Sequence, residues 1–450
     1  MAVEQLEPPI QPADSRTAVA GPPGPVRVLV LDVAELPAVL DCAHPDGGTY
    51  EALWVLAMRD ARPLGMVEVP VHAPELDAAE LRRALSAGLG ERWLAPAPSE
   101  PAHQSPALAL PRASVVVPTS LGRPEQLLAC VRALARLDYP DYEIVVVDNR
   151  RQGGAGEEVL ARLGEIAPVR VVAQRRPGIS AARNAGIAVA DGEIVAFTDD
   201  DVEVDRGWLR ALGERFVREP GVAGVTGMVV PKELETPAQI WFEESGTGLD
   251  RTFATLSFEL QAPATGHPLA GERFRMLRIA AGESAARVDS LYAVGELGQG
   301  ANMAFRASAL RAAGGFDEAL GAGTPAQGGE DLAMLVELLV AGSRLAYEPT
   351  AIVHHTHRRT LPELERQILG YGLGFTAMLT ALIWRDRRHL LGLARVLPAG
   401  LHAMLGGPST KRVRRSAGFP PHLARLELVG MVRGPLAYLA SRRSQRRWRP

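Results

Sequence analysis

The sequence predicts an α/β protein whose central sheet is mostly parallel. Between residues 113 and 230, short apolar segments typical of buried strands alternate with segments whose apolar residues recur at helical spacing. This alternation is typical of βαβ units joined by right-handed crossovers. The chain has 450 residues, which is too long for one typical domain. We therefore expect a small module before this region and an extension after it.

The first part of the chain predicts a disordered tail and then a small α+β module. Residues 1–25 are dominated by Pro, Ala and Gly, and they offer little apolar surface to offset the entropy lost on ordering. Within residues 26–95 we expect a strand at Val26–Val33 and a hairpin formed by Ala52–Met58 and Gly65–Val71. The apolar positions of the helix that follows are Leu76, Leu81, Leu85 and Leu89.

The alternating region is expected to occupy residues 112–357, after a linker at residues 96–111 that is rich in Pro, Ala and Ser. Its strands are expected at Ser114–Pro118, Glu143–Asp148, Val169–Ala173, Ile194–Thr198 and Val222–Val230. Its helices are expected around Leu127–Leu137 and at Glu157–Ile166, Ser180–Ala190 and Trp208–Val217. Ser180 is a candidate N-cap for the third of these helices.

The pattern lapses at residues 233–297, which we interpret as an insertion of the kind that is usually functional or mobile. Regular structure is expected to resume with Gly300–Phe305, followed by a helix from Ala307 and a second helix that Gly328–Asp331 opens. Two short strands are expected after it, at Arg344–Tyr347 and Ala351–Val353.

Residues 358–450 predict a helical and strongly basic extension. From Arg385 onward there are 15 Lys and Arg against 2 Asp and Glu, a local charge of +13 in a chain whose net charge is −3. Apolar clusters that alternate with Arg clusters fit an anionic membrane surface. The apolar stripe from Leu361 to Leu382 predicts a helix packed on the preceding domain. Gln367–Trp384 contains glycines and polar residues that make it a poor membrane span.

Composition disfavours several classes of protein. The two cysteines, Cys42 and Cys130, do not indicate a disulfide framework or a structural zinc site. The first 24 residues have no basic start and no apolar segment, which predicts a cytoplasmic protein rather than an exported one. A nucleic-acid partner is not expected, because the basic residues lie on apolar helices without an interleaved aromatic platform.

Polar residues follow the predicted strands at the point where each strand ends. Thr119 follows the first strand, Asp148 ends the second, and Asp199, Asp200 and Asp201 follow the fourth. The carboxyl ends of parallel strands share one edge of a sheet, where such folds bind ligands. Adjacent carboxylates repel each other and suit a hard cation such as Mg²⁺ or Mn²⁺. A solvated acidic turn is the alternative interpretation. Neither a dinucleotide-binding glycine motif nor a Walker motif is present.

Several segments resemble those of family-two glycosyltransferases. The nucleotide-sugar-binding half is similar in Ser114–Thr119, Tyr142–Asp148, Pro177–Gly186 and Phe197–Asp201. The acceptor half is similar in Gly300–Phe305, Gly315–Asp317 and Gly329–Asp331. The resemblance covers about residues 112–357, and the whole arrangement resembles the rhamnosyltransferase-like or mycofactocin-type branch of the family. It implies the Rossmann-like GT-A fold and sugar transfer with inversion at the anomeric carbon.

The resemblance also implies which residues contact the donor. Pro118 and Thr119 would contact the nucleotide, and Asp148 would bind its base. Arg183 would lie near the nucleotide or the diphosphate, with a salt bridge on the helix surface as its alternative role.

The same resemblance implies a metal site. Asp199 would approach the ribose or the metal, and Asp201 would bind the metal. Asp200 stands where the family pattern has a neutral residue, and we place it among the substrate-binding residues. Of the cluster formed by His354, His355 and His357, the register favours His355 as the further metal ligand and His357 second, with an exposed turn as the alternative.

A base is needed for the acceptor hydroxyl, on the face opposite the leaving group. By resemblance this base is Asp331, with Glu330 as its local rival, while both acids also suit the start of a helix. Glu330 is therefore placed among the substrate-binding residues. Asn302 is expected to line the sugar pocket or to cap a turn.

These interpretations together predict a metal-dependent enzyme that moves a sugar from a nucleoside diphosphate donor to a glycan, a lipid-linked acceptor, or a small-molecule or peptide-derived acceptor. We expect it at the cytoplasmic face of the membrane. One alternative is a nucleotidyltransferase, which requires a basic loop after the first strand, where residues 119–124 offer only Arg123. The other is a non-catalytic nucleotide-sugar-binding scaffold, which Asp201 and Asp331 disfavour.

Overall fold

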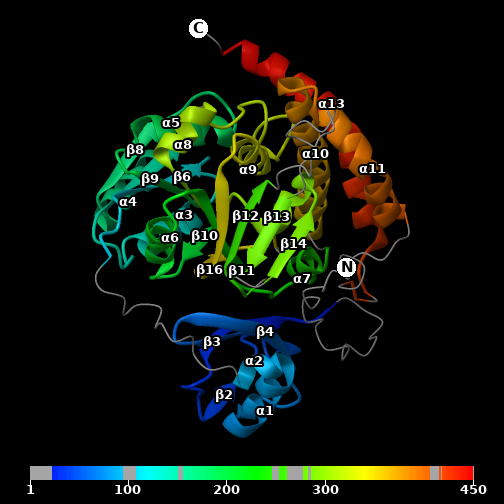
Figure 1. The fold of residues 1–450 in the computed structure, drawn as a ribbon. Helices are drawn as coiled ribbons and strands as arrows, with labels where there is room; N and C mark the ends of the chain where they lie inside the picture. Colours follow the sequence, from blue (N-terminus) through cyan, green and yellow to red (C-terminus); the bar gives the residue numbers. More distant parts are fainter. Residues whose placement is uncertain are drawn as a thin grey trace.

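A computed structural model of the chain describes residues 23–94, 108–150, 156–245, 253–260, 277–281, 285–405, 415–416 and 418–448. Most of the predicted tail and most of the predicted linker lie outside these residues. Figure 1 shows a small N-terminal module in blue, a large α/β body, and C-terminal helices in orange and red along one side of that body. The predicted α/β class, with a small module before the body and a helical extension after it, is confirmed.

The N-terminal module has two small sheets and its own apolar core. One sheet has the order β1–β3–β4 and the other pairs β2 with β5. Their strands are β1 (Val26–Asp32), β2 (Val39–Asp41), β3 (Ala52–Arg59), β4 (Arg62–Pro70) and β5 (Glu75–Asp77). The predicted hairpin is β3–β4. Helix α1 (Ala78–Leu89) and the short α2 (Glu91–Leu94) follow. Leu76, predicted on the helix, lies in β5, because Asp77 caps α1 through the N–H of Glu80.

The body is built on one eleven-stranded sheet of order β14–β13–β12–β16–β11–β15–β9–β6–β7–β8, with β10 paired to β16. Strands β6 to β9 are mutually parallel, β11 is parallel to β16, and β15 runs antiparallel between β9 and β11. The strands are β6 (Ala113–Thr119), β7 (Tyr142–Asp148), β8 (Val169–Ala173), β9 (Ile194–Phe197), β10 (Val202–Val204), β11 (Val222–Pro231), β12 (Leu256–Leu260), β13 (Leu277–Ala281), β14 (Ala285–Asp289), β15 (Met303–Arg306) and β16 (Arg344–His355).

Helices cover both faces of this sheet. On one face lie α3 (Pro124–Leu134), α4 (Gly156–Ile166) and α6 (Trp208–Arg218), and on the other α5 (Ile179–Val189), α8 (Ala307–Ala313) and α9 (Glu330–Val340). Each face of the sheet has its own apolar core, and the side chains of β6 point to the two faces alternately. Val115 and Val117 pack on the side of α3, and Val116 packs on the side of α5. Strands buried on both faces explain the nearly continuous apolar runs in the sequence.

Four expectations about the local structure of the body are wrong. Ser180 is not the N-cap of α5: the cap is Gly178, and the Ser180 hydroxyl donates to the carbonyl of Leu320 at 2.8 Å. The strand expected from Gly300 begins at Met303, and the two strands expected after α9 form the single strand β16. The region 233–297 is not only an insertion, because it supplies α7 (Pro237–Glu244), the antiparallel strands β12 to β14, and the 3₁₀ helix η2 (Leu291–Leu297).

The C-terminal extension consists of α10 (Leu361–Arg385), α11 (His389–Leu405) and α13 (Pro421–Arg446). Helix α10 begins with a capping box formed by Thr360 and Glu363, and its apolar stripe packs on the body as predicted. Gly372, Gly430 and Gly434 let α10 and α13 approach closely, since a Cβ at any of them would collide with the facing helix. Within the described residues, α10 alone is long and apolar enough to cross a membrane, and half of that window is buried in the protein.

Candidate active site

The polar strand ends meet at one edge of the sheet. Thr119 pairs with Asp148 in the parallel register of β6 and β7, and the acids that follow β9 lie beside them. The contact that joins them is a hydrogen bond from the Thr119 hydroxyl to Asp200 Oδ2, of 2.6 Å. The structure thus gives Asp200 a role that the sequence did not predict, which is to tie the end of β6 to the turn after β9. Burial, together with the adjacent Asp201, raises the pKa of Asp200 to about 6.

Asp201 lies between a histidine and two arginines. Its Oδ2 atom contacts the guanidinium groups of Arg123 and, at 3.4 Å, Arg358, whereas its Oδ1 atom is 3.5 Å from Nε2 of His355. Burial alone would raise the pKa of this carboxyl, but His355 in its charged form, together with Arg123 and Arg358, lowers it below its ordinary value. Burial also lowers the pKa of His355, to about 4, despite the attraction of Asp201. The site therefore presents a carboxylate and a neutral imidazole.

Arg183 connects Asp199, on the donor side of the site, to Glu330, the residue before the predicted base Asp331. It extends from α5, is 1% exposed, and donates to Glu330 Oε1 at 2.7 Å and to Asp199 Oδ1 at 3.2 Å. The same guanidinium also donates to the carbonyl of Gly300 and lies 5.6 Å from the ring of Phe316. The alternative of a surface salt bridge for Arg183 is excluded by this burial.

Asp331 is oriented by the backbone around it. Its Oδ2 accepts the N–H of Gly300 at 2.7 Å and its Oδ1 accepts the N–H of Leu332 at 2.8 Å. Helix α9 begins at Glu330, one residue before Asp331. Its N-cap, Gly329, takes a left-handed conformation with a φ of 85° and packs against the backbone of Gly374. Asp331 remains partly exposed, whereas Glu330 is buried on Arg183. An acceptor hydroxyl can therefore reach Asp331 more easily than Glu330.

Two further acids in this site carry raised pKa values, in addition to Asp200. Burial and the adjacent Asp331 raise the pKa of Glu330 to about 7, against the opposing attraction of Arg183. Burial likewise raises the pKa of Asp199, helped by Asp201 and Asp331 and opposed by Arg183. A buried arginine paired with two acids whose pKa values are raised marks a candidate functional site.

Asp148 and Pro118 lie at the strand ends as predicted. Asp148 is almost fully buried, and its two oxygens accept from Nε of Arg150 at 3.1 and 3.0 Å. Pro118 is buried within β6 opposite Val147. A ligand that used the Asp148 carboxylate would have to share it with Arg150.

The position of Asn302 contradicts the prediction that this residue lines the sugar pocket or caps a turn. The side chain is fully buried, and its Nδ2 donates to the carbonyls of Met228 at 2.9 Å and Ala351 at 2.7 Å. Its Oδ1 accepts from Nε1 of Trp208 at 2.8 Å. The amide therefore joins strands β11 and β16 to helix α6, and its donors are already used within the protein.

The residues present fit a divalent cation at Asp201 and His355. Their facing atoms are 3.5 Å apart, a gap that two coordination bonds of roughly 2.1 Å can bridge. Among the described residues no three His, Cys, Asp or Glu side chains converge on one point. Mg²⁺ is commonly held by one or two carboxylates while substrate phosphates complete its shell, and Asp201 would be such a carboxylate. His354, by strand alternation, belongs to the other face of β16.

Four residues of the site were not among those predicted from the sequence. Arg123 and Arg358 contact Asp201, Gly300 bonds both Arg183 and Asp331, and Glu243 binds His357. Arg358 could have been found from its place directly after the histidine cluster, and Arg123 from its place in the loop after the first strand end. Glu243 had no local signal, since it lies 114 residues away from His357 in the sequence.

Comparison with known proteins gives a family for part of the chain. Residues 114–275 match the model described as "Glycosyl transferase family 2". Over 196 residues, 43% of this chain, the sequence is 33% identical to a pre-mycofactocin glycosyltransferase of Mycobacterium tuberculosis. Over 123 residues, 26% of this chain and 36% of the relative, it is 33% identical to glycosyltransferase AglE of Haloferax volcanii.

These matches cover only part of each protein. The aligned part is 33% of the length of the mycobacterial relative, so the chain spans about a third of it. Among solved structures, the mannosyltransferase PcManGT from Pyrobaculum calidifontis, in complex with GDP-Man and Mn²⁺, has a TM-score of 0.45 at 17% identity, over 76% of this chain and 92% of that one.

Proposed function

Because this chain carries a glycosyltransferase family 2 domain, we propose that it transfers a sugar from a nucleoside diphosphate sugar to an acceptor hydroxyl, with inversion at the anomeric carbon. The observation that carries this proposal is a chain of contacts between acids at one edge of the sheet. Thr119, which pairs with Asp148, donates to Asp200, and Arg183 joins Asp199 to Glu330, the neighbour of Asp331. Each of these groups has a use in breaking a sugar–phosphate bond.

The donor would lie along the carboxyl ends of β6, β7 and β9. Pro118, Thr119 and Asp148 are positioned to contact the nucleoside, and Asp199 and Asp200 to contact the ribose and diphosphate. Arg123 and Arg358 both pair with Asp201 and therefore lie next to the place where the diphosphate would bind. They would turn from that carboxylate to the diphosphate, because guanidinium groups bind phosphate oxygens well. Glu330 would act indirectly, by holding Arg183 in place.

The chemical step needs a base and a stabilised leaving group. Asp331 would take the proton of the acceptor hydroxyl while the acceptor oxygen bonds to the anomeric carbon. The bond from that carbon to the phosphate oxygen breaks, and the nucleoside diphosphate leaves with the electron pair. The hydrogen bonds to Asp331 from the N–H groups of Gly300 and Leu332 fix the direction of its oxygens. A Mg²⁺ or Mn²⁺ ion held by Asp201 and His355 would stabilise the charge on the leaving diphosphate.

A thermal-shift screen tests the donor class. Nucleoside diphosphate sugars would be tested with and without Mg²⁺ or Mn²⁺, because a ligand that binds the folded state raises the melting temperature. We expect a rise with at least one donor that requires the metal and that is lost in Asp201→Asn. Equal shifts for nucleoside triphosphates and diphosphate sugars would favour nucleotidyl transfer instead. A donor that binds but is neither hydrolysed nor transferred would favour a scaffold.

We also propose that the C-terminal helices rest on the cytoplasmic face of an anionic membrane. Helix α13 exposes Leu428, Val432 and Leu436 at one-turn spacing, with Val432 79% and Leu436 71% exposed. Arg425 lies before this stripe, and Arg443 and Arg447 follow it at the other end of the helix on the same face. An apolar stripe with arginines at both ends suits an interfacial helix.

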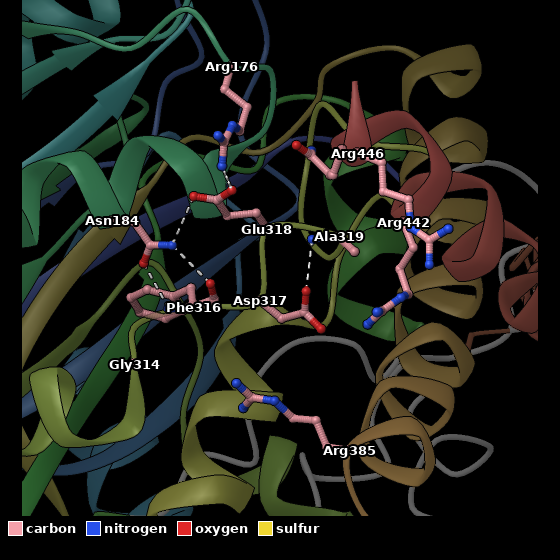
Figure 2. A pocket seen from close by; sticks show the side chains of 11 residues that line it. Arg176, Asn184, Gly314, Phe316, Asp317, Glu318, Ala319, Arg385, Arg442 and Arg446 are labelled. Atoms are coloured by element: carbon pink, nitrogen blue, oxygen red, sulfur yellow. Dashed lines mark hydrogen bonds and ion pairs between the residues drawn. The ribbon is translucent and has the colours of Figure 1, made fainter. Parts of the chain in front are cut away.

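A cleft beside α13 supports the same proposal. Figure 2 shows Arg442 and Arg446 of α13 facing the segment that contains Phe316 and Asp317, with Arg176 and Arg385 at the other walls. The cleft has a volume of about 410 Å³ and a polar lining. Arg176 pairs with Glu318, but among the described residues neither Arg442 nor Arg446 forms an ion pair with a carboxylate. Phosphate groups of lipids suit such a site.

Vesicle binding tests this part. The double variant Val432→Asp/Leu436→Asp should lose co-sedimentation with vesicles of phosphatidylserine and phosphatidylcholine, and wild-type binding should weaken with salt. Leu94→Asp is the matched control, because Leu94 is 81% exposed on the N-terminal module. Equal binding of all three proteins would exclude α13 as the membrane contact.

A further inference from the structure

A chain of buried polar side chains ends at the proposed metal ligand His355. Nδ1 of His355 is 2.9 Å from Nδ1 of His357, and Nε2 of His357 is 2.7 Å from Oε1 of Glu243. On the other side of His355, Nε2 faces Asp201 Oδ1 at 3.5 Å. Glu243 lies on α7 and is 9% exposed, and His357 follows β16 and is 4% exposed. Helix α7, the end of strand β16 and the turn after β9 therefore meet in one line of contacts.

The hydrogen-bonding capacity of each group fixes where the protons lie. A carboxylate only accepts hydrogen bonds, so Glu243 takes the proton on Nε2 of His357, which is the one ring proton of the uncharged imidazole. The other nitrogen of His357, Nδ1, then has a lone pair and accepts. Nδ1 of His355 must donate to it, which leaves Nε2 of His355 without a proton. The lone pair of that Nε2 faces Asp201.

We propose that Glu243 and His357 are positioning residues that hold His355 in the tautomer whose Nε2 lone pair faces Asp201, ready to bind a divalent cation. This inference rests on the proposed metal site. It adds two residues that do not touch the metal and that determine whether His355 can bind it. Carboxylates that set the tautomer of a metal-binding histidine are a known way to tune such a site.

The geometry on the Asp201 side agrees with a bare Nε2. The 3.5 Å separation between Nε2 and Oδ1 is long for a charge-assisted hydrogen bond, which is normally 2.7–2.9 Å. Asp201 instead directs its other oxygen to Arg123 and Arg358. A lone pair and a carboxylate that face each other repel, and a cation between them removes that repulsion.

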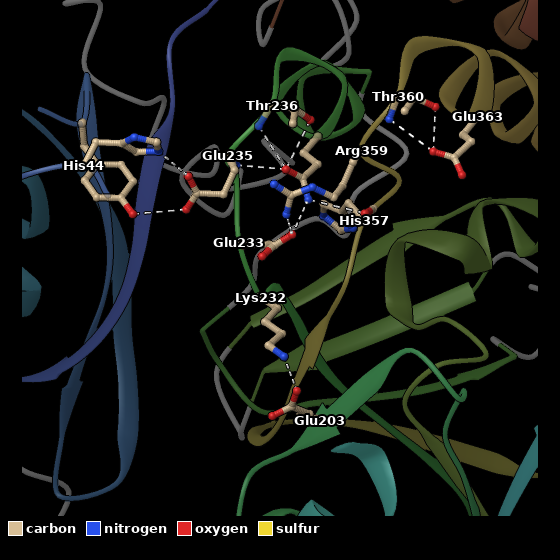
Figure 3. A network of polar contacts seen from close by, with 12 residues as sticks. His44, Glu203, Lys232, Glu233, Glu235, Thr236, His357, Arg359, Thr360 and Glu363 are labelled. Atoms are coloured by element: carbon tan, nitrogen blue, oxygen red, sulfur yellow. Dashed lines mark hydrogen bonds and ion pairs between the residues drawn. The ribbon is translucent and has the colours of Figure 1, made fainter. Parts of the chain in front are cut away.

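The rings are also held in place by packing. The ring of Phe242 lies 4.4 Å from that of His357, centroid to centroid, and the two histidine rings are 5.1 Å apart. Figure 3 shows His357 within the polar network at the base of α7, where Gln239 Nε2 donates to the His357 carbonyl at 3.4 Å. His357 therefore has little freedom to turn its ring and exchange its two nitrogens.

Nitrogen NMR of histidine-labelled, metal-free protein tests the tautomers directly. We expect the proton of His355 on Nδ1 and that of His357 on Nε2, assigned with His354→Gln and His357→Gln variants. A proton on Nε2 of His355 in the wild type would overturn the inference. This measurement involves neither donor nor transfer, so its result is independent of whether the proposed function holds.

Metal affinity tests the consequence. In Glu243→Gln the amide can donate as well as accept, so the preference for one His355 tautomer is lost, and we expect Mn²⁺ to bind about 10- to 100-fold more weakly. Glu244→Gln is the matched control, because Glu244 is the next residue of α7 and binds Ser416 instead. Glu243→Asp should restore part of the affinity. Melting temperatures would show that the variants are folded.

The outcomes separate the two proposals. Wild-type protein that fails to bind Mn²⁺, even with donor present, contradicts the metal site itself. Wild-type protein that binds Mn²⁺ with the same affinity as Glu243→Gln contradicts the positioning role alone.

Discussion

Gly300 shows how little room the site leaves at the scale of a single residue. Its carbonyl accepts from Arg183 and its N–H donates to Asp331, so its backbone lies between the residue that joins the acids and the proposed base. A Cβ here would lie 2.8 Å from Nη2 of Arg183 and 3.2 Å from Oδ2 of Asp331. Both neighbours are held by other contacts and cannot move freely.

Gly300→Ala should therefore impair both stability and transfer. We expect a loss of about 1–3 kcal/mol in the free energy of unfolding, measured by urea denaturation, and a fall in kcat. Gly164→Ala is the control, since a Cβ at this position in α4 meets no atom within 4 Å. Alanine should stabilise that helix by about 0.5–1 kcal/mol. Similar effects of the two substitutions would contradict the tight packing at Gly300.

The pH dependence of stability follows from Glu330. Burial and Asp331 raise its pKa from the ordinary 4.5 to about 7 in the folded protein. The folded state thus holds the proton more tightly than the unfolded state does, so this stabilisation is complete below pH 4.5 and is lost as the pH rises to about 7.

Glu330→Gln removes that titration. Between pH 4.5 and 7 the stability of the wild type should fall relative to that of the variant, by about 1–3 kcal/mol in urea unfolding. A stability difference that stays constant over this range would show that Arg183 keeps Glu330 ionised throughout.

At the scale of elements, helix packing against the body sets the position of α9 and the C-terminal region. Gly329 starts α9 in a left-handed conformation that also fits against the backbone of α10, so Asp331 and α10 are positioned together. Helix α10 in turn packs against α13 through Gly372, Gly430 and Gly434. Changes at this helix pair should therefore affect the surface proposed to contact the membrane.

Gly372→Ala should force α10 and α13 apart. A Cβ on Gly372 would overlap the carbonyl oxygen of Glu427, and a backbone atom cannot turn away as a side chain can. We expect a loss of about 1–3 kcal/mol in unfolding free energy and faster proteolysis within α13. Unchanged proteolysis, with Gly164→Ala as the reference, would contradict this packing.

The sequence predicts the parts of the site that follow directly from strand position. Thr119, Asp148 and Asp201 each end or follow an apolar strand, and parallel strands bring such ends to one edge. The contact between Glu243 and His357 could not be predicted in the same way. It depends on how α7 and β16 pack, and no periodicity relates the two residues.

Asn302 shows the other limit of prediction from sequence. A polar residue beside a recognised motif indicates a binding role, yet its amide bonds Trp208, Met228 and Ala351 within the core. Region 233–297 was not predicted as part of the sheet because its strands follow no βαβ pattern. Strands β12 to β14 add to an edge through long-range antiparallel pairing, which leaves no βαβ alternation in the sequence.

At the scale of the whole molecule, the N-terminal module contacts the body next to the connection between β11 and α7. Figure 3 shows His44 facing Glu235 of that connection, with their atoms 2.9 Å apart, and the N–H of Val26 donates to the carbonyl of Leu234 at 2.8 Å. The same connection leads into α7, which carries Glu243. The module thus contacts the connection that leads into α7, the helix on which Glu243 is proposed to position the metal ligand.

Asp331 is proposed to act as the base for sugar transfer at the edge of the sheet where the strand ends meet. The most direct test compares Asp331→Asn with the wild type, measuring donor binding by calorimetry and transfer by the rate of nucleoside diphosphate release with acceptor. We predict unchanged donor affinity and transfer reduced by about 10²- to 10⁴-fold. Near-normal transfer in Asp331→Asn, with the metal and donor bound as in the wild type, would contradict the claim.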